Sequence, residues 1–325
     1  MRENTDNDPK NILTVENLKK YFPVKKGFWQ KTRAWVRAVD HVDFSLPQGK
    51  TLGLVGESGC GKSTLGRTIL RLLEPDQGSI RFQNREITSL DKRELKRLRK
   101  KMQIVFQDPQ GSLNPKMSIQ STLEDGLRVT RVPRPRRREK IKSLLETVGL
   151  SEDCMKRFPH EFSGGQRQRI GLARALSVNP ELIVCDEPIS SLDVSIQAQI
   201  INLLQNLQNE LGLSYVFITH DLNVVGYVSD WVAVMYLGQI VEYATTEKLF
   251  QNPLHPYTRA LIAASPAIRP QTKLQTLPGE VPSAFQPPSG CRFQSRCPFR
   301  ESRCGQEQVR LTQKDSGHWV RCLLT

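Results

Sequence analysis

The chain has 325 residues, of which 38% are hydrophobic and 25% are charged, and this composition is typical of a globular protein. No apolar run is long enough to span a membrane; residues 224–241 come nearest, but polar residues and glycine interrupt them, and we interpret them as two buried strands. The N-terminal residues 1–10 lack the apolar core of a signal peptide. We therefore expect a cytoplasmic protein that relies on a partner for any membrane spans.

The formal net charge is +14, and basic residues gather in residues 92–101 and 131–142. Such runs fit either an anionic partner such as nucleic acid or the solvated faces of helices. Aromatic residues do not interleave with them, which argues against a groove that stacks single-stranded bases. We favour solvated helices and expect no nucleic-acid partner.

Strands and helices alternate along the first part of the chain. The expected strands are 11–18, 36–46, 51–55, 102–106, 182–185 and 214–219, and the expected helices are 63–73 and 195–212. Residues 111–178 are mostly helical in pattern. This alternation predicts an α/β fold with a parallel sheet and a helical subdomain at about 111–178. Prolines become frequent between Pro253 and Pro298, so we divide the chain into domains 1–250 and 251–325.

A glycine-rich loop follows the expected strand 51–55 and fits the pattern G-x-x-x-x-G-K-[ST]. Its glycines let backbone N–H groups turn toward phosphate, and the helix that follows directs its positive end at the same anion. Lys62 would reach the β- and γ-phosphates, and the Ser63 hydroxyl would bind Mg²⁺. The predicted ATP-binding residues here are Gly56, Glu57, Ser58, Gly59, Cys60, Gly61, Lys62, Ser63 and Thr64. We expect the Cys60 side chain to be inert.

Two carboxylates end the apolar strand Leu182–Cys185. Ligands bind at the carboxyl edge of such sheets. Asp186 is predicted to hold Mg²⁺ through water, and Glu187 to orient and deprotonate the water that attacks ATP. A strand-end pair of acids is weak evidence alone, and it gains force from the phosphate loop.

Residues 162–166, Phe-Ser-Gly-Gly-Gln, resemble the signature sequence of ABC ATPases, although that family usually has Leu where this chain has Phe162. Ser163, Gly164, Gly165 and Gln166 would form a helix N-terminus that meets the γ-phosphate held by a second subunit. The resemblance implies a P-loop NTPase fold of the ABC nucleotide-binding type, in which ATP joins two ATPases. The alternative is an ordinary helix cap by Ser163.

Other family motifs are also matched. Gln107 resembles the Q-loop glutamine, which touches Mg²⁺; Asp193 lies in a stretch that resembles the D-loop; and His220 resembles the switch histidine that contacts the γ-phosphate. Phe22 resembles the aromatic residue on which adenine stacks, with Tyr21 as the competing choice. The resemblance thus covers residues 22–220.

Residues 252–258, 279–283 and 287–291 look like the extension shared by ATPases of oligopeptide, dipeptide and nickel importers, and the phosphate-loop region is most similar to the second, F-type, ATPase. The resemblance implies import of di- or oligopeptides at the cytoplasmic face of the inner membrane. The implied partners are a related second ATPase in a heterodimer, two permeases, and a periplasmic or lipoprotein binding protein. A nickel importer of the same family is the alternative.

Two other classes fit less well. ABC ATPases of DNA repair or translation usually carry two ATPase halves or a long coiled-coil insert, and this chain has one phosphate loop and a short insert. A scaffold without activity would not need Glu187, which is present together with the other ATPase residues.

Cysteines crowd the end of the chain, where Cys291, Cys297, Cys304 and Cys322 follow the spacing C-x5-C-x6-C-x17-C. Four thiolates suit a [4Fe–4S] cluster or a zinc site, and the spacing does not choose between them. Similarity to the tails of peptide-importer ATPases favours the cluster, in a small irregular cysteine-rich module. His318 is an alternative ligand, and four free thiols are the remaining alternative. Arginines flank the cysteines and would offset the cluster's negative charge: Arg292, Arg296, Arg303 and Arg321.

Overall fold

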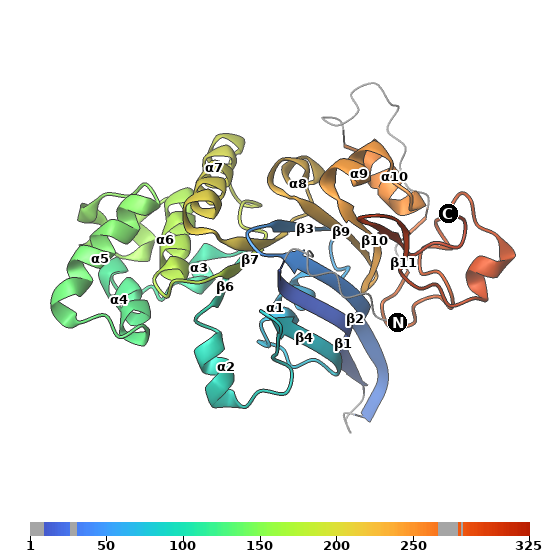
Figure 1. The fold of residues 1–325 in the computed structure, drawn as a ribbon, viewed down its shortest axis with the longest axis horizontal. Helices are drawn as coiled ribbons and strands as arrows, with labels where there is room; N and C mark the ends of the chain where they lie inside the picture. The colour runs from blue at the N-terminus through green and yellow to red at the C-terminus, as the bar shows by residue number, and fades with distance from the viewer. Residues whose placement is uncertain (1–9, 27–30, 266–278, 281) are drawn as a thin grey trace. The chain divides into compact units, whose positions relative to one another are not determined.

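A computed structural model describes residues 10–26, 31–265, 279–280 and 282–325. The predicted absence of a signal peptide rests mainly on residues 1–9, and one motif position is Val281; both lie outside the described residues. The chain forms two compact units, which we call unit 1 (residues 1–90 and 217–325) and unit 2 (residues 91–216). Figure 1 shows their elements.

Unit 1 begins with an antiparallel sheet of strand order β2-β1-β4-β5. Its strands are β1 (Asn11–Lys26), β2 (Lys31–Pro47), β4 (Gln77–Phe82) and β5 (Arg85–Glu86). The first two are longer than the expected strands 11–18 and 36–46, because their outer ends continue to pair with each other from Tyr21↔Arg37 to Lys26↔Lys31. Strands β4 and β5 are not predicted by the sequence pattern, because they are short and rich in polar residues.

A second sheet of unit 1 carries the phosphate loop (Figure 1). Its central strand β3 (Thr51–Val55) is buried throughout and pairs in parallel with β9 (Trp231–Tyr236). Antiparallel pairing then adds β10 (Gln239–Thr245), β12 (His318–Val320) and β11 (Thr312–Asp315). The helical elements of unit 1 are α1 (Lys62–Ile69), α8 (Leu222–Val228), α9 (Thr246–Gln251), α10 (Pro256–Ala263) and the 3₁₀ turn η3 (Ser302–Gly305).

The interpretation of residues 224–241 as two buried strands is wrong for their first part. Residues up to Val228 belong to α8, whose start is capped by the Asp221 carboxylate, which accepts a hydrogen bond from the backbone N–H of Asn223. Only β9 and the start of β10 are strands. Leu222 and Val225 are buried at helical spacing, a pattern that the other apolar residues of this stretch concealed.

Unit 2 confirms the helical character of residues 111–178. Its helices are α2 (Lys92–Leu98), α3 (Pro109–Ser112), α4 (Ile119–Val129), α5 (Arg134–Thr147), α6 (Gly164–Leu176) and α7 (Val194–Leu211), with 3₁₀ turns η1 (Glu152–Lys156) and η2 (Pro159–Glu161). Strands β6 (Met102–Val105) and β7 (Leu182–Asp186) pair in parallel, and the chain then leaves the unit within β8 (Ser214–Ile218). The basic runs lie largely in α2 and α5, whose charged residues are mostly exposed.

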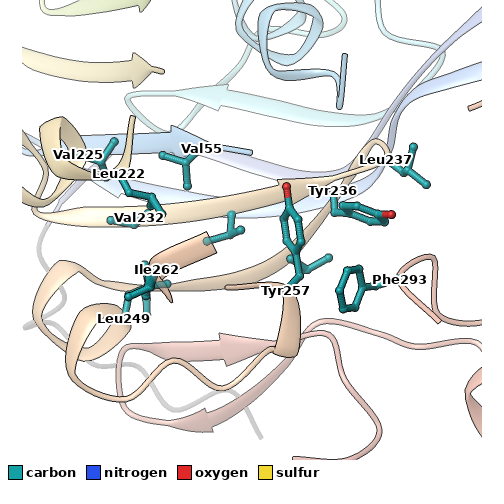
Figure 2. Close-up of a cluster of buried hydrophobic side chains, with 13 residues drawn as sticks. Val55, Leu222, Val225, Val232, Tyr236, Leu237, Leu249, Tyr257, Ile262 and Phe293 are labelled. Atoms are coloured by element: carbon teal, nitrogen blue, oxygen red, sulfur yellow. The ribbon is translucent and has the colours of Figure 1, made fainter. Parts of the chain in front are cut away.

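The C-terminal segment, residues 251–325, belongs to unit 1 and does not form a unit of its own. Phe293 and Tyr257 are buried with Val55 of β3 and Tyr236 of β9 in one hydrophobic cluster, as Figure 2 shows. The three aromatic rings lie close together, with centroid separations of 4.7 Å for Tyr236–Tyr257 and 5.3 Å for Tyr236–Phe293. The expected boundary near residue 250 therefore divides a continuous core, because the Pro-rich sequence supplies core side chains without regular periodicity.

Within the described parts of the chain, none of the helices combines the length and the apolar character needed to cross a membrane.

Candidate nucleotide-binding site

The loop of residues 56–63 joins β3 to α1 and has the backbone that its glycines predict. Gly56 has φ 152° and Gly61 has φ 108°, in the region that side chains rarely adopt. A Cβ on Gly56 would lie 2.1 Å from the Met235 carbonyl oxygen, and one on Gly61 would lie 2.0 Å from the Ala38 carbonyl oxygen. Ser58 and Gly59 are exposed at the tip of the loop. Only glycine fits the two closely packed ends, and the tip remains open to a ligand.

Lys62 begins α1 and is buried. Its ammonium group donates hydrogen bonds to the carbonyl oxygens of Gly56 at 2.7 Å and Glu57 at 3.1 Å. Cys60 is also buried, and burial raises the pKa of its thiol. A protonated, inaccessible thiol is a poor nucleophile, which agrees with the expectation that this side chain is inert.

His220 follows β8 in unit 1. The preceding residue, Thr219, donates its backbone N–H to the carbonyl oxygen of Leu54 in β3 at 3.2 Å. The Thr219 hydroxyl accepts the N–H of Asp221 at 3.1 Å, which fixes the turn. The exposed His220 thus follows a residue bonded to the strand that leads into the phosphate loop.

In unit 2, the acids at the end of β7 have different surroundings. Asp186 is 1% exposed, whereas Glu187 is half-buried and has φ 47°, so the chain turns sharply between them. The side-chain amide of Gln107 donates to a carboxylate oxygen of Glu187 at 2.8 Å. The structure thus joins two residues that the sequence analysis had assigned to separate motifs.

The residues of the signature sequence form a helix cap. The Ser163 hydroxyl accepts the backbone N–H of Gln166 at 3.3 Å, and the Gln166 side chain accepts the N–H of Ser163 at 3.0 Å. This reciprocal pair is the capping box that begins α6. A Cβ on Gly165 would lie 2.5 Å from a methyl group of Ile196, so glycine permits close packing there. Ser163 and Gly164 remain exposed, as an anion site at a helix N-terminus requires.

Asp193 also caps a helix, because its carboxylate accepts the backbone N–H of Ile196 at 2.9 Å at the start of α7. The structure therefore gives this residue a local role, and its predicted contact with nucleotide remains a prediction. The predicted magnesium ligands are divided between the units, with Ser63 in unit 1 and both Gln107 and Asp186 in unit 2.

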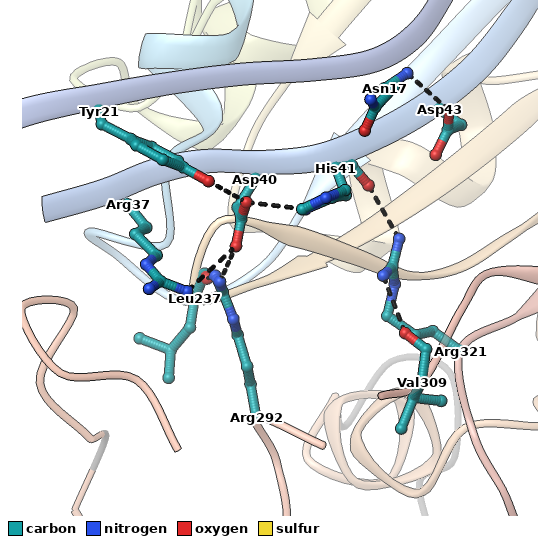
Figure 3. Close-up of polar contacts among 10 residues, drawn as sticks. All are labelled: Asn17, Tyr21, Arg37, Asp40, His41, Asp43, Leu237, Arg292, Val309 and Arg321. Atoms are coloured by element: carbon teal, nitrogen blue, oxygen red, sulfur yellow. Dashed lines mark hydrogen bonds and ion pairs between the residues drawn. The ribbon is translucent and has the colours of Figure 1, made fainter. Parts of the chain in front are cut away.

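The two candidate adenine-stacking residues are adjacent on β1, so their side chains point to opposite faces of the strand. The hydroxyl of Tyr21 donates to Asp40 (Figure 3), whereas Phe22 is half-buried with the Lys20 ammonium 5.5 Å from its ring centroid. The Tyr21 hydroxyl is committed to Asp40, which favours Phe22 for stacking.

Asp40 is the centre of a buried polar network shown in Figure 3. Burial alone would raise the pKa of its carboxyl, but hydrogen bonds and charges from Tyr21, Arg292 and His41 outweigh that effect and lower the pKa. Arg292 also donates to the carbonyl oxygen of Leu237. The network thereby fastens the C-terminal segment to β2.

The arginines beside the cysteines are thus engaged with protein acceptors. Arg321 donates to carbonyl oxygens of His41, Ile240 and Val309 at 2.8–3.1 Å. Arg296 pairs with Glu57, and Arg303 pairs with Glu301 at the surface. These contacts hold the fold together or lie at the surface, and the expectation that the same arginines offset the charge of a cluster stays a prediction.

All four C-terminal cysteines lie in the described part of the chain, and none of them forms a disulfide bond. Cys291 and Cys297 pack against the hydrophobic cluster of Figure 2, and the N–H of Cys291 donates to the carbonyl oxygen of Cys304 at 2.8 Å. Burial raises the pKa of the Cys291 thiol to about 11, and the thiols of Cys322, Cys297 and Cys304 raise it further by smaller amounts. No three His, Cys, Asp or Glu side chains in the described ranges are grouped to hold a metal ion. The predicted cluster and cysteine-rich module therefore gain no support from this geometry.

The chain carries three features of one class of protein: the phosphate loop of residues 56–63, the acids Asp186 and Glu187 at a strand end, and the helix cap of Ser163. They are typical of P-loop ATP-binding proteins. Comparison with known proteins narrows this class. Residues 39–190 match the ABC transporter family, and residues 241–304 match the oligopeptide/dipeptide transporter C-terminal region.

The oligopeptide transport ATP-binding protein AppF of Bacillus subtilis is 48% identical over 96% of this chain and 97% of its own length. The dipeptide transport ATP-binding protein DppF of Haemophilus influenzae is 48% identical over 99% of this chain and 98% of its own length. Among solved structures, cbiO1 of Clostridium perfringens, part of the ABC transporter complex cbiONQ, has a TM-score of 0.64 at 28% identity and covers 75% of this chain and 92% of its own. The ATP-binding cassette MJ0796, a dimer bound to ADP and phosphate, also has a TM-score of 0.64 at 28% identity, and the match covers 72% of this chain and 98% of the MJ0796 chain. The chain belongs to the family of ATP-binding subunits of oligopeptide and dipeptide ABC transporters, and it is an ABC-type ATPase.

Two residues that contact the phosphate loop were not among the predicted site residues. The hydroxyl of Tyr257 accepts the backbone N–H of Glu57 at 3.0 Å, and Arg296 binds the Glu57 side chain. The only signal in the sequence was chemical complementarity between an acid in the loop and a distant arginine. Nothing in local spacing connects residues so far apart.

Proposed function

We propose that this protein hydrolyses ATP to power an ABC importer of di- or oligopeptides across the bacterial cytoplasmic membrane. The observation that carries the proposal is near-full-length similarity to peptide-transport ATP-binding proteins, which includes the C-terminal region as well as the ATPase region. A nickel importer is the second candidate, because the C-terminal extension of this chain also resembles that of nickel-importer ATPases. The ATPase fold alone would not distinguish the cargo.

In this proposal, the residues divide the work as follows. The loop N–H groups and Lys62 bind the phosphates, and Phe22 stacks on adenine. Ser63, Gln107 and Asp186 would hold Mg²⁺, which neutralises charge on the phosphates. Glu187, oriented by its hydrogen bond from Gln107, accepts a proton from the attacking water, and His220 contacts the γ-phosphate.

The site is completed by a second ATPase. Ser163 and Gly164 are exposed at the start of α6 with no phosphate-binding loop in their own unit 2. Val194, at the start of α7 beside Asp193, is 81% exposed, and a large apolar side chain in this position suits burial against a partner. We infer that the partner is a related, distinct chain, so that each ATPase contributes its cap to the other's nucleotide.

The remaining partners are two permeases and a periplasmic or lipoprotein peptide-binding protein. The ATPase would then lie peripherally at the cytoplasmic face of the inner membrane. The family relation to transport subunits supports membrane attachment through permeases. Basic helices α2 and α5 have solvated faces that need no nucleic-acid partner.

A transport assay tests the proposal. The complex is co-purified from membranes, reconstituted, and supplied with labelled dipeptides, oligopeptides or nickel ions in the presence of ATP. Peptide uptake that Lys62→Ala abolishes would support the assignment. ATP-dependent uptake of nickel without peptide uptake would replace it with the second candidate, and absence of ATP hydrolysis by the assembled complex would refute it.

The finer proposal of a [4Fe–4S] cluster rests on donor chemistry. The other three thiols each raise the pKa of Cys291, in a segment with few regular elements, and thiolates are the ligands that such clusters use. The ligands would be Cys291, Cys297, Cys304 and Cys322, and binding would require loss of their protons. The cluster would stabilise this segment.

Anaerobic purification with assays for iron and acid-labile sulfide tests the cluster. Four iron and four sulfide per chain, lost in Cys297→Ser, would support it. A colourless protein with stoichiometric zinc would support a zinc site instead, and a metal-free protein with four titratable thiols would support free cysteines. Cys60→Ser is a matched control, because Cys60 lies in the phosphate loop and its loss should leave the metal content unchanged.

A further inference from the structure

The second residue of the phosphate loop is held by the C-terminal segment. The guanidinium of Arg296 donates to both carboxylate oxygens of Glu57, at 2.9 and 3.1 Å. This two-point geometry fixes the orientation of both groups as well as their separation. The Arg296 side chain is 6% exposed and that of Glu57 is 27% exposed, so the pair is shielded from water on the arginine side.

The backbone of Glu57 is held from the same side. Its N–H donates to the hydroxyl of Tyr257 at 3.0 Å. Tyr257 is fully buried against Tyr236 and Phe293, and its ring position is therefore set by the core (Figure 2). Arg296 is likewise near this cluster, with its guanidinium carbon 5.9 Å from the ring centroid of Tyr236. Side chain and amide of one loop residue are thus anchored to a rigid surface.

The opposite side of the same peptide units is held from within the loop. Lys62 donates to the carbonyl oxygens of Gly56 and Glu57. The first part of the loop is therefore constrained on both sides, whereas Ser58 and Gly59 at the tip are exposed. Anchoring a glycine-rich loop in one conformation lowers the entropy that is lost when it closes around an anion.

We propose that Arg296 is a positioning residue for nucleotide: by clamping Glu57 it preorganises the phosphate loop, and so the C-terminal segment sets the affinity for ATP. This inference rests on the proposed role of residues 56–63 in phosphate binding. Arg296 acts through Glu57, and its loss should weaken nucleotide binding far more than it slows the chemical step. A lysine at position 296 would keep the positive charge but lose the two-point geometry, so it should preserve only part of the contribution to nucleotide affinity.

The test uses the full-length protein and a fluorescent ATP analogue, with KM and kcat measured in the assembled complex. We expect Arg296→Ala to raise the dissociation constant and KM roughly five- to tenfold, about 1 kcal/mol or slightly more, with kcat within about twofold. Arg296→Lys should fall between this variant and the wild type. Glu57→Gln should match Arg296→Ala, and the double variant should be no worse than either single variant because both remove one interaction. Arg303→Ala removes an exposed arginine of the same segment and should leave affinity unchanged.

Unchanged affinity in a folded Arg296→Ala protein, or effects of Arg296→Ala and Glu57→Gln that multiply, would overturn the clamp. If Arg296→Ala does not fold, Arg296→Lys and Glu57→Gln decide by the same criteria. Lys62→Ala separates failure of the clamp from failure of the proposed phosphate site. If Lys62→Ala abolishes ATP binding while the Arg296 variants bind ATP with normal affinity, only the clamp is overturned. If Lys62→Ala itself binds ATP normally, the proposed role of residues 56–63 is overturned.

Discussion

The side-chain amide of Gln107 donates a hydrogen bond to the carboxylate of Glu187, with 2.8 Å between nitrogen and oxygen. The bond links the segment after β6 to the residue after β7 within unit 2. An acceptor-only carboxylate held by an amide donor has a defined direction, which a general base needs if it is to meet the attacking water.

Glu187→Gln should leave ATP binding intact and lower kcat by at least about a hundredfold, because general-base catalysis typically contributes that much or more. The variant preserves size and removes the base. Turnover in the assembled complex and binding of a fluorescent ATP analogue measure the two effects. Hydrolysis close to the wild-type rate would show that another group deprotonates the water.

Gln107→Ala should lower kcat less than Glu187→Gln does, by roughly tenfold, because the base remains while its orientation and one of the three proposed magnesium ligands are lost. The two substitutions should not be additive, since both act on the same carboxylate. Single-turnover ATP hydrolysis by the two single variants and the double variant gives the coupling. Fully additive effects would contradict a role of Gln107 through Glu187.

The isolated subunit should be a poor ATPase whose specific activity rises with protein concentration and with addition of the partner ATPase. The Ser163 cap and the phosphate loop of one nucleotide site come from different chains in the proposed arrangement. Val194→Asp should weaken this activation, because it replaces an 81% exposed apolar side chain of the proposed dimer interface with a charged one. Full activity of a dilute subunit, independent of concentration, would refute the shared site.

Arg292→Met should destabilise unit 1 by about 3–5 kcal/mol, because Arg292 and Asp40 are 4% and 3% exposed and the substitution removes the buried cation that pairs with this carboxylate. The double variant Arg292→Met/Asp40→Asn should recover a large part of that loss. Urea unfolding measures both. Arg303→Met, at an exposed pair, is the control and should change stability by less than about 1 kcal/mol.

His255 introduces a pH dependence. It caps the N-terminus of α10, where its Nδ1 accepts the N–H of Tyr257 at 3.1 Å, and burial lowers the pKa of the imidazole from 6.5 to about 4. Between these values the unfolded chain binds a proton that the folded chain does not, so stability falls as pH drops from about 6.5 to about 4 and is fully retained above that range.

The loss from this group amounts to roughly 3 kcal/mol across the window. His255→Asn keeps an N-cap acceptor and removes the titration, so it should flatten this part of the stability profile. Urea unfolding at pH 7 and pH 5 compares the variant with the wild type. Equal pH dependence in both proteins would contradict a neutral buried histidine.

Local patterns in the sequence were sufficient for the helical subdomain, for the phosphate loop and for the strand ending at Asp186, because each is specified by neighbouring residues. They failed where the fold depends on distant partners. The hydrophobicity of residues 224–228 predicts a strand, but they belong to a helix that Asp221 caps and that buries Leu222 and Val225. The Arg292–Asp40 and Arg296–Glu57 pairs could not be foreseen, since nothing local determines which acid a distant arginine meets.

The Arg296–Glu57 contact spans 239 positions of the chain, and the Tyr257 contact spans 200. Synthesis proceeds from the N-terminus, so the ribosome delivers the complete phosphate loop long before the residues that hold it. It follows from the proposed clamp that a nascent or C-terminally clipped chain carries every phosphate-binding residue yet holds ATP weakly. Tight nucleotide binding is then a property of the finished polypeptide, and an incomplete subunit competes poorly for ATP in the cell.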